Sequence, residues 1–446
     1  MRAWQGICLS AVLLVSFASV CRAQSSVTPE DEYKQLIKVN QDIQPLGAHP
    51  FGENISLYDG TLTFAETDVS LPGNGPTIEL GRSLAPEEFP GYGVLSLYPF
   101  YDWDLDIPRI ETITAIPAGW QTSTAGNPTG GTNRCSNFTP PPYAPSTVGG
   151  GGGMWAPSLF WYGYHLILPG QGNQELMPRA SANTLAPTIS GKSFSIVTKN
   201  NWMVGCGVTA SDGGEGFLAI APDGTRYTFA HLVYRPAATL SAAAGPIAPP
   251  PTTAGVSAQS AAQPMVAGAN ILERNDALMY VTQIQDRFGN TLTYNYDPTS
   301  GYLSSITAND GREVDVTYVS GSPLIHSITA KATDVAPRTW TYTYAPSLTG
   351  VQLPDGSAWS FSGFGGVFSG EPIIPTGGGG DCYTKQLPTV PTLTPTGTIT
   401  HPSGLTVAVR SPQRRLNRVR VLRRASRRRR AAPVLLRRRH RRWLLG

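Results

Sequence analysis

The sequence is most regular in the segment DRFGNTLTYNYDPTSGYLSSITANDGREVDVTY, residues 286–318. Residues 291–296 alternate between apolar and polar side chains, which is the period of a half-buried β-strand. Gly289 and Asn290 stand just before this run, and both residue types tolerate the positive φ of a tight turn. Two more short strands are predicted after further turns, at residues 303–307 and 314–318. The segment therefore predicts consecutive β-hairpins.

The same segment fits a longer pattern, D-x-x-G-N-x-x-x-Y-x-Y-D followed by G-x-L-x-x-I and a D-G-R turn. The residues that match it are Asp286, Gly289, Asn290, Tyr294, Tyr296, Asp297, Gly301, Leu303, Ile306, Asp310, Gly311 and Arg312. In this order they resemble the YD repeat of RHS proteins, a bacterial family of wall-associated and polymorphic-toxin proteins. Weaker matches to the pattern lie at residues 340–344 and 353–356, and the turn and strand at 223–229 resemble it as well. Because one repeat cannot bury its apolar face alone, we expect the copies to pair side by side in a continuous sheet.

A second resemblance lies upstream of the repeats. Residues 67–74, TDVSLPGN, and the strand-like run 78–82, IELGR, are similar to the segment that precedes the repeats in RHS proteins. Residues 102–110 are similar to another part of that segment. The resemblance covers residues 45–405, and in that family long repeat arrays form a β-sheet shell around a C-terminal domain, often a toxin. The two to three copies found here are too few to close such a shell.

Composition favours the same fold class. Glycine and proline are frequent, with 48 and 39 residues, whereas charged residues make up 14%, and this balance suits many short strands and turns. The predicted fold is all-β, with short antiparallel strands from an N-terminal β-rich region and from YD repeats that form part of a β-sheet shell. The expected organisation is a signal peptide at 1–23, a short helix and linker at 24–44, the N-terminal β region at 45–235, a low-complexity Ala/Pro/Ser loop at 236–270, the YD-repeat region at 271–405 and an Arg-rich tail at 406–446.

The first residues have the features of a secretory signal peptide. Arg2 precedes an apolar run at residues 7–17, which is too short to span a bilayer. Cys21 and Ala23 provide small residues at the −3 and −1 positions, so we expect cleavage after Ala23. Lipidation of Cys21 would need a small residue before it, and Val20 stands there. We therefore expect a secreted, cell-surface or periplasmic protein without a membrane span in the mature chain.

The cysteines fit an oxidising compartment. Cleavage of the signal would leave Cys135, Cys206 and Cys382, which allow one disulfide and one spare thiol. The pair Cys135 and Cys206 is the candidate disulfide. No C-x-x-C or Cys/His spacing indicates a zinc site, and no metal or cofactor is expected.

The charge is divided sharply along the chain. Residues 410–446 contain 16 arginines and no Lys, Asp or Glu, which leaves 18 of the 34 basic residues against 30 acidic ones in the rest. The absence of Lys and the abrupt change where a repeat should continue indicate a frameshift near residues 405–413, so that the tail is out of frame and disordered. The alternative is a genuine basic arm that neutralises phosphates. Despite this tail, we expect no nucleic-acid partner.

Three carboxylates and the repeat tyrosines are the polar or aromatic clusters that could bind a ligand. Asp102, Asp104 and Asp106 alternate with apolar residues, and we interpret them as a solvated strand face rather than a cation or acid–base site. The tyrosines could stack against sugars or pack within the sheet, and packing is favoured. They are Tyr294, Tyr296, Tyr342 and Tyr344.

No catalytic constellation emerges from the sequence. The six histidines show no ligand spacing, and the chain has no G-x-S-x-G motif. The predicted function is a non-enzymatic secreted or cell-surface RHS scaffold that, in its full form, encapsulates or presents a C-terminal toxin or mediates intercellular interaction. The toxin domain itself would be absent from this chain. The alternatives are an envelope β-protein that binds cell-envelope glycans and a secreted hydrolase, for which no acid–base pair is found.

Overall fold

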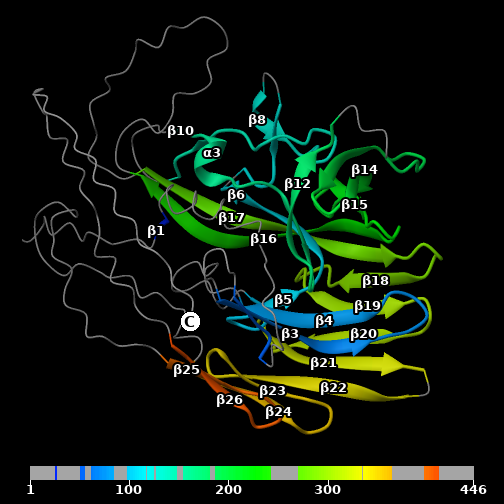
Figure 1. Cartoon of the computed structure of the whole chain (residues 1–446). Helices are drawn as coiled ribbons and strands as arrows, with labels where there is room; N and C mark the ends of the chain where they lie inside the picture. The colour runs from blue at the N-terminus through cyan, green and yellow to red at the C-terminus, as the bar shows by residue number, and fades with distance from the viewer. Residues whose placement is uncertain are drawn as a thin grey trace, which may run out of the picture. The chain divides into compact units, whose positions relative to one another are not determined.

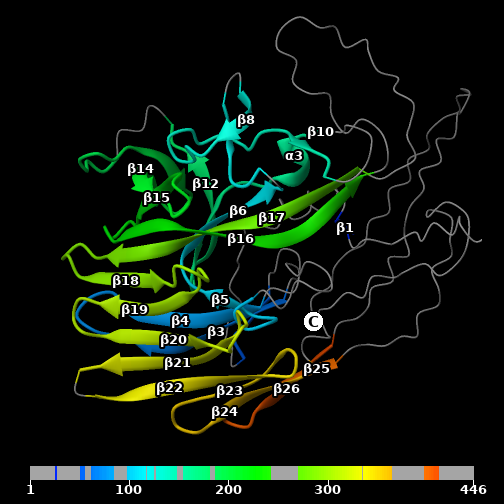
Figure 2. The same ribbon diagram turned by 180° about the vertical axis from the view of Figure 1, so that it is seen from behind.

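The computed structural model describes residues 26–27, 51–55, 62–84, 98–116, 118–124, 127–147, 154–180, 186–242, 270–333, 335–363 and 396–410. All of them belong to one compact unit, Met1–Ser411, and this unit is an all-β structure built mainly from antiparallel strands (Figures 1 and 2). The predicted fold class is therefore confirmed. The expected signal peptide, the short helix, Cys382 and the Arg-rich residues 411–446 lie outside the described residues.

A four-stranded antiparallel sheet forms the N-terminal part of the unit. Its strands, in spatial order, are β2 (Glu53–Ile55), β3 (Leu62–Leu71), β4 (Ile78–Leu84) and β5 (Asp104–Asp106). Apolar residues alternate along β3 and β4, and Phe64, Val69, Ile78 and Leu80 are buried on the same face. The sequence TDVSLPGN forms the end of β3 and the loop that joins it to β4.

Among the described strands, eight pair in a closed ring. In order they are β6 (Arg109–Ala115), β11 (His165–Leu168), β12 (Gly172–Pro178), β13 (Phe194–Thr198), β14 (Met203–Thr209), β15 (Glu215–Ile220), β16 (Arg226–Ala242) and β17 (Asn270–Gln285). The ring closes because β6 pairs with β11 on one side and with β17 on the other. Short elements accompany the ring: β1 (Ser26–Val27), β7 (Thr122–Thr124), β8 (Asn127–Gly131), β9 (Ala144–Pro145), β10 (Met154–Trp155) and the one-turn helix α3 (Pro157–Phe160).

The repeat region extends from β17 as nine further strands, each antiparallel to the one before it. They are β18 (Thr291–Tyr296), β19 (Leu303–Ala308), β20 (Glu313–Tyr318), β21 (Ile325–Ala332), β22 (Val335–Tyr344), β23 (Leu348–Gln352), β24 (Ala358–Ser362), β25 (Thr396–Thr400) and β26 (Thr406–Arg410). The expectation that the copies pair side by side in one sheet agrees with this order. The first three strands also begin and end within a residue of their predicted positions.

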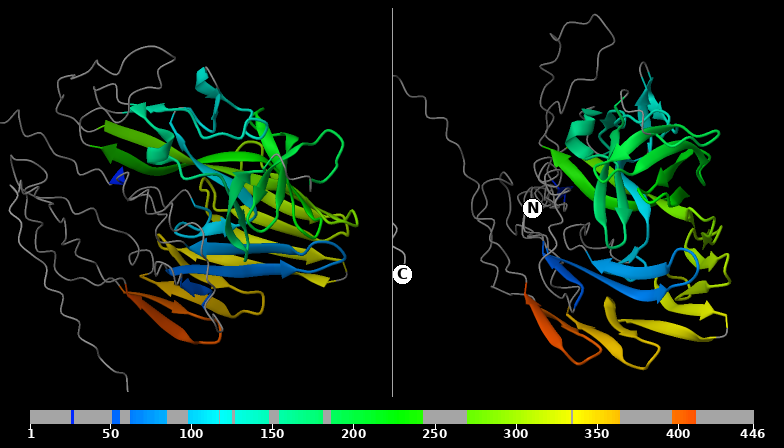
Figure 3. Two further views of the ribbon diagram at one scale, coloured as in Figure 1. Left: turned by 45° about the horizontal axis from the view of Figure 1, so that its top comes forward. Right: turned by 45° about the vertical axis from the view of Figure 1, so that its right-hand side comes forward.

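The main core lies between the repeat strands and the N-terminal sheet. In Figure 3 the strands of the repeat region curve around β3 and β4, which lie on the concave side. Phe100 meets Tyr342 at 4.8 Å between ring centroids, and Trp103 meets Phe361 at 5.5 Å. Edge-to-face and tilted contacts of this kind add to the stabilisation from burial of the apolar surface. Each sheet therefore supplies the apolar face that the other needs.

Two segment boundaries differ from those read in the sequence. Residues 236–242 continue β16, although their Ala/Pro composition indicated the start of a loop. They remain extended because Pro236 pairs with Asn275 and Leu240 with Leu272 across the hairpin. At the other end, β26 contains the first five residues of the expected tail and ends at Arg410. It does so because residues 406–410 pair without a register shift with residues 396–400.

Candidate functional site

Five described hairpins at one edge of the main sheet end in the same five-residue turn. In each turn the first residue donates its N–H to the carbonyl of the fifth, and a glycine in the fourth position donates to the carbonyl of the first. These glycines have φ between 84° and 91°, a region that other residues seldom occupy. The turns lie at one edge of the sheet because each follows a strand of the same direction, and we call them the turn rim: residues 221–225, 286–290, 308–312, 353–357 and 401–405.

Asp286 closes the turn that begins the predicted repeat. Its Oδ1 accepts hydrogen bonds from the backbone N–H of Phe288 at 2.8 Å and of Asn290 at 2.9 Å, and its Oδ2 accepts from Asn290 Nδ2 at 2.7 Å. The bond from the Asn290 side chain is the main reason why the pKa of Asp286 lies below its usual value. Gly289 supplies the left-handed residue. The D-x-x-G-N part of the motif is therefore a self-contained turn.

Asp310 and Arg312 belong to the next turn of the turn rim. This turn also contacts the N-terminal sheet. The Arg312 Nε lies 2.9 Å and 2.8 Å from the two carboxylate oxygens of Asp310, and this pairing holds the pKa of Asp310 below its usual value. Arg312 is only 5% exposed. Its Nη1 donates to the Leu71 carbonyl at 2.5 Å and its Nη2 to the Pro76 carbonyl at 3.0 Å. Arg312 thus uses the planar fork of arginine to join β20 to the N-terminal sheet.

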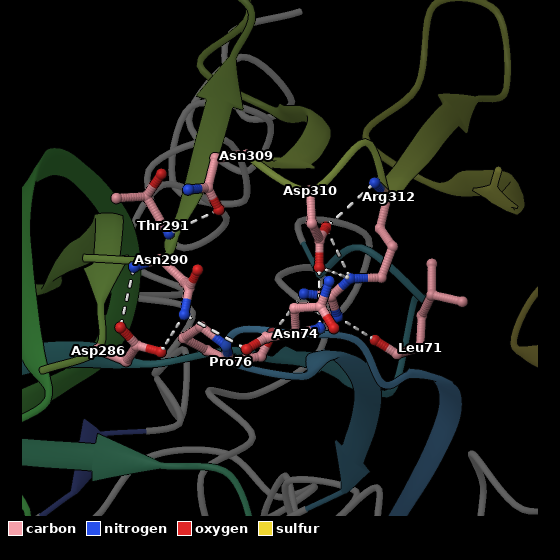
Figure 4. Close-up of polar contacts among 9 residues, drawn as sticks. All are labelled: Leu71, Asn74, Pro76, Asp286, Asn290, Thr291, Asn309, Asp310 and Arg312. Atoms are coloured by element: carbon pink, nitrogen blue, oxygen red, sulfur yellow. Dashed lines mark hydrogen bonds and ion pairs between the residues drawn. The ribbon is translucent and has the colours of Figure 1, made fainter. Parts of the chain in front are cut away.

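The loop between β3 and β4, residues 72–77, lies directly on the turn rim (Figure 4). Asn74 donates its N–H to Asp310 Oδ2 at 3.1 Å and accepts from Asn290 Nδ2 at 3.3 Å. The loop therefore contacts two turns at once. Both bonds run to residues that the repeat motif contains.

Two glycines allow the loop to approach so closely. A Cβ on Gly73 would lie 2.1 Å from Arg312 Nε, and a Cβ on Gly75 would lie 2.5 Å from Asn290 Cβ. Real side chains do not approach to these distances. The L-P-G-N-G sequence thus has the shape that the rim requires, and we call the contact between residues 71–76 and the turns at 286–290 and 308–312 the rim clasp.

Tyr296, Tyr318 and Tyr344, each at the end of a strand, have one repeated role. Tyr296 donates its hydroxyl to the Val281 carbonyl at 2.7 Å, and the equivalent bonds from Tyr318 to Leu303 and from Tyr344 to Ile325 are 2.9 Å and 2.6 Å long. In each case the acceptor belongs to the preceding strand. The first tyrosines, Tyr294 and Tyr342, are buried in the core. The packing interpretation of the tyrosines therefore agrees with the structure, and a stacking platform for sugars does not.

Asp297 and Gly301 form the opposite end of the first hairpin. Asp297 Oδ1 accepts from the backbone N–H groups of Thr299 and Ser300 at 3.0 Å and 2.7 Å. Gly301 has φ 73°, and its carbonyl accepts a hydrogen bond from His231 Nε2 at 2.8 Å. The His231 ring stacks on Tyr296 with 3.9 Å between centroids. These motif residues also serve the hairpin itself.

The interpretation of Asp102, Asp104 and Asp106 as a solvated face is wrong. Asp102 is 2% exposed, and its Oδ1 accepts the Leu348 N–H at 3.1 Å. Burial raises its pKa to about 6. Asp104 pairs with the guanidinium of Arg235 at 2.7 Å, and burial also raises the pKa of Asp106. Alternation of the residues correctly separated these side chains from the apolar ones, but Leu348 of β23 and Arg235 of β16 contact the face that was expected to meet water.

A second ionic group lies between the two sheets and was not recognised in the sequence. Asp68 accepts the Tyr342 hydroxyl at 2.9 Å and lies 3.4 Å from Arg82 Nη1. The Arg82 guanidinium is buried and faces the rings of Trp103, Trp359 and Phe361 at 5.3 to 5.6 Å. The only available signal was the resemblance of the TDV and IELGR segments to the region before the repeats, which contains both Asp68 and Arg82.

Cys135 and Cys206 are joined by a disulfide, with their Cα atoms 5.3 Å apart. It links the segment after β8 to β14 across 71 residues. Nearby, Glu215 Oε2 accepts the N–H groups of Cys135 and Ser136 at 2.9 Å and 2.8 Å. The bond therefore fixes a long loop to the wall of the ring.

The described residues give the motif side chains structural roles. They contain no group of three or more His, Cys, Asp or Glu residues placed to hold a metal ion. Of the predicted residues, the structure brings together Asp286, Asn290, Asp310 and Arg312 through the rim clasp, whereas Asp297 and Gly301 lie at the opposite end of the hairpin. Among the described helices, none has the length and hydrophobicity that a membrane crossing requires.

Comparison with known proteins gives structural likeness only. No protein-family model and no curated protein matches the chain. The crystal structure of TcdB2-TccC3 is 10% identical, with a TM-score of 0.31, over 77% of this chain and 17% of that one. The crystal structure of TcdB2-TccC3-Cdc42 is also 10% identical, with a TM-score of 0.28, over 70% and 16%. The chain therefore spans less than a fifth of these two chains.

A third similar structure is the N-terminal domain of effector protein SpvB from Salmonella typhimurium strain LT2. It is 8% identical to this chain, with a TM-score of 0.27, and the match covers 67% of this chain and 94% of that domain. At these identities and TM-scores the similarity does not assign the chain to a family.

Proposed function

We propose that this chain is a non-enzymatic scaffold of the RHS type, the front part of a β-sheet shell that encloses or presents a C-terminal toxin domain or mediates contact between cells. The observation that carries the proposal is the rim clasp. The L-P-G-N segment and the D-G-R turn each resemble RHS proteins independently in sequence, and they meet through Arg312, Asp310 and Asn74. In a scaffold, this contact would hold the first sheet to the repeat strands.

The use of the motif side chains supports a structural rather than a catalytic role. Asp286 and Asn290 complete a turn, Arg312 binds two carbonyls of the other sheet, and Tyr296 binds the neighbouring strand. Their hydrogen-bonding groups are therefore engaged within the fold. Export through the expected signal peptide would place such a scaffold outside the cytoplasm, where the Cys135–Cys206 disulfide is stable.

The test is co-purification of the full chain with the polypeptide encoded directly downstream of it. The proposal predicts a stable complex in which the downstream polypeptide resists a protease that degrades it when it is alone. A downstream polypeptide that neither binds nor gains protection would contradict the scaffold. Reading that DNA in all frames checks the frameshift hypothesis in parallel, because the correct frame should resume D-x-x-G-N and Y-x-Y-D repeats.

One feature favours the second candidate, an envelope β-protein that binds glycans. The exposed face of the repeat sheet carries paired hydroxyls, such as Thr317 with Ser327 at 2.8 Å and Thr329 with Thr339 at 3.0 Å. Hydroxyl rows can exchange hydrogen bonds with sugars, but they lack the exposed aromatic rings on which sugars stack. Retention of the full chain on purified peptidoglycan or a glycan array would favour this candidate, and no retention on either would exclude it.

A further inference from the structure

The turn between β25 and β26 is closed by a histidine side chain. His401 is the first residue of this turn, and its Nδ1 accepts the backbone N–H of Ser403 at 3.0 Å. The Ser403 hydroxyl lies 2.7 Å from the same nitrogen. The backbone of the turn has the two bonds that define the turn rim, from His401 to Leu405 and from Gly404 to His401. The imidazole therefore acts as the side-chain acceptor that closes the turn.

A carboxylate has this role in the other four turns of the turn rim. Asp286 Oδ1 accepts the N–H of Phe288, two residues further on, in the same way as the histidine does. In the remaining turns an aspartate in the third position accepts the N–H of the fifth residue, and these aspartates are Asp223, Asp310 and Asp355. Carboxylates ordinarily stay ionised, and so remain acceptors, down to about pH 4.

An imidazole differs because it accepts only through a nitrogen that carries no proton. A backbone N–H can only donate, so the bond from Ser403 requires a neutral His401 with its proton on Nε2. Histidine is the side chain that ordinarily changes charge between about pH 5 and pH 8. Protonation would place a hydrogen on Nδ1. The Ser403 hydroxyl could turn to accept from it, but the backbone N–H would lose its acceptor.

The ring of His401 also contacts two other parts of the protein. It meets Trp359 of β24 edge-to-face with 4.6 Å between centroids, and Phe51, two residues before β2, with 6.5 Å. Both aromatic residues are buried. The turn at 401–405 therefore contacts the segment that leads into the N-terminal sheet as well as the repeat strands. A charge on the imidazole would lie against this apolar surface, where it is poorly solvated.

One cation and two carboxylates lie on the elements around this contact. The guanidinium of Arg82 on β4 lies 5.6 Å from the centre of the Trp359 ring, so an imidazolium would add a second cation beside the same indole. Glu53 Oε2 accepts the Phe51 N–H at 2.9 Å, and the Asp355 carboxylate closes its own turn. The carboxylates are thus bound within their own segments, whereas repulsion by Arg82 favours the neutral ring.

We propose that the turn at 401–405 is a pH-sensitive contact between the repeat strands and the N-terminal segment. It is closed and packed against Phe51 and Trp359 while His401 is neutral, and it opens when His401 binds a proton. Since the proton binds the open turn more readily, the closed turn is favoured at high pH and is lost as the pH falls. The pairing of β25 with β24 does not involve the ring, so the change is local. This inference does not depend on the proposed function.

The test is amide hydrogen exchange of the full chain at about pH 8 and about pH 5, with rates corrected for the intrinsic effect of pH. The peptides to follow cover residues 51–55 and 399–406. Their protection in the wild type should be about fivefold lower at the acidic pH, which is the factor that one hydrogen bond of ordinary net strength contributes. Peptides from the ring, such as β15, should keep their protection. Equal protection of both peptides at the two pH values would overturn the proposal.

His401→Asp is the decisive variant, because it installs the kind of acceptor that Asp286 provides in its own turn. The ratio of protection at the two pH values should be close to one in this variant. Comparing ratios within each variant removes the effect of the lost ring contacts. His326→Ala, at an exposed histidine of β21, is the matched control and should keep the wild-type ratio. A pH dependence that persists in His401→Asp, or that disappears in His326→Ala, would show that another group controls the turn.

The tautomer of the ring gives an independent check. In the full chain with isotopically labelled histidine, nuclear magnetic resonance at about pH 8 should show the His401 proton on Nε2, because Nδ1 accepts the Ser403 N–H. The His401 signal is assigned by its absence from the His401→Asp spectrum. A proton on Nδ1 at this pH would contradict the closing bond on which the pH sensitivity depends.

Discussion

The guanidinium of Arg312 and the backbone carbonyl of Leu71 lie 2.5 Å apart between Nη1 and O, although 241 residues separate them in sequence. The bond is buried and is one of two that Arg312 makes to the ends of the β3–β4 loop. A buried carbonyl without a hydrogen-bond donor costs free energy. Removal of the guanidinium would therefore also leave the Leu71 carbonyl unpaired. Arg312 is therefore the residue through which a repeat turn holds the N-terminal sheet.

Replacing Arg312 should destabilise the protein strongly. Arg312→Ala leaves two carbonyls without their donor and should lower the free energy of unfolding by about 2–4 kcal/mol. Arg312→Lys keeps the charge but loses the planar fork, so its loss of unfolding free energy should be smaller than that of Arg312→Ala but greater than zero. Arg338→Ala, at an exposed arginine of β22, is the control and should change stability by less than about 0.5 kcal/mol. Urea unfolding of the three variants measures this, and equal costs for Arg312 and Arg338 would contradict the role.

A methyl group at Gly75 should open the rim clasp. Gly75→Ala brings a Cβ to 2.5 Å from Asn290 Cβ, and overpacking of this kind costs about 1–3 kcal/mol. A protease should then cut the β3–β4 loop faster than in the wild type. It should cut the segments between the ring strands at the wild-type rate. Ser70→Ala, at an exposed position of β3, is the matched control. Unchanged cleavage of the loop in Gly75→Ala would mean that the loop does not rest on Asn290.

The hydroxyls of the three tyrosines that bond to a neighbouring strand should contribute separately to stability. Tyr296→Phe, Tyr318→Phe and Tyr344→Phe each remove one bond to a neighbouring carbonyl and should each cost about 1 kcal/mol. Tyr302→Phe is the control, because its ring is 37% exposed. Thermal unfolding of the single variants and of the triple variant should give nearly additive losses. A loss from Tyr302→Phe as large as the others would show that the hydroxyl bonds are not the cause.

Stability should depend on pH through Asp102. Burial raises its pKa to about 6, so the folded protein holds this proton more tightly than the unfolded chain does. The contribution is present at low pH and is lost as the pH rises through 6, by up to about 3 kcal/mol for a shift of this size. Asp102→Asn keeps an acceptor for the Leu348 N–H but cannot ionise. Between about pH 4 and 7 its unfolding free energy should fall less than that of the wild type, and identical slopes over this range would contradict this.

Local pattern was sufficient to predict the hairpins but not the surfaces that cover them. Alternation and glycine turns gave the strands that became β18, β19 and β20, because both signals arise within a few residues. The same alternation misplaced Asp104, whose partner Arg235 lies on a strand 131 residues away. A period of two separates the faces of a strand. It does not indicate which face meets water.

The candidate site shows the same limit. The sequence selected Asp286, Asn290, Asp310 and Arg312 as motif residues, yet their shared partner, the loop at 72–77, is reached only when the N-terminal sheet folds onto the repeats. The ring closure by β6 is also non-local, since residues 109–115 pair with residues 274–280. Resemblance to one family marked both segments, but their contact depends on tertiary packing.

The most direct test of the rim clasp is amide hydrogen exchange of a peptide that covers residues 71–78 in the full chain. The Asn74 N–H donates to Asp310 Oδ2, so this peptide should be protected in the wild type. In Arg312→Ala its protection should be lost while the strands of the ring, such as β15, keep theirs. A peptide that exchanges as fast as an exposed loop in the wild type, or that stays equally protected in a folded Arg312→Ala variant, would contradict the account.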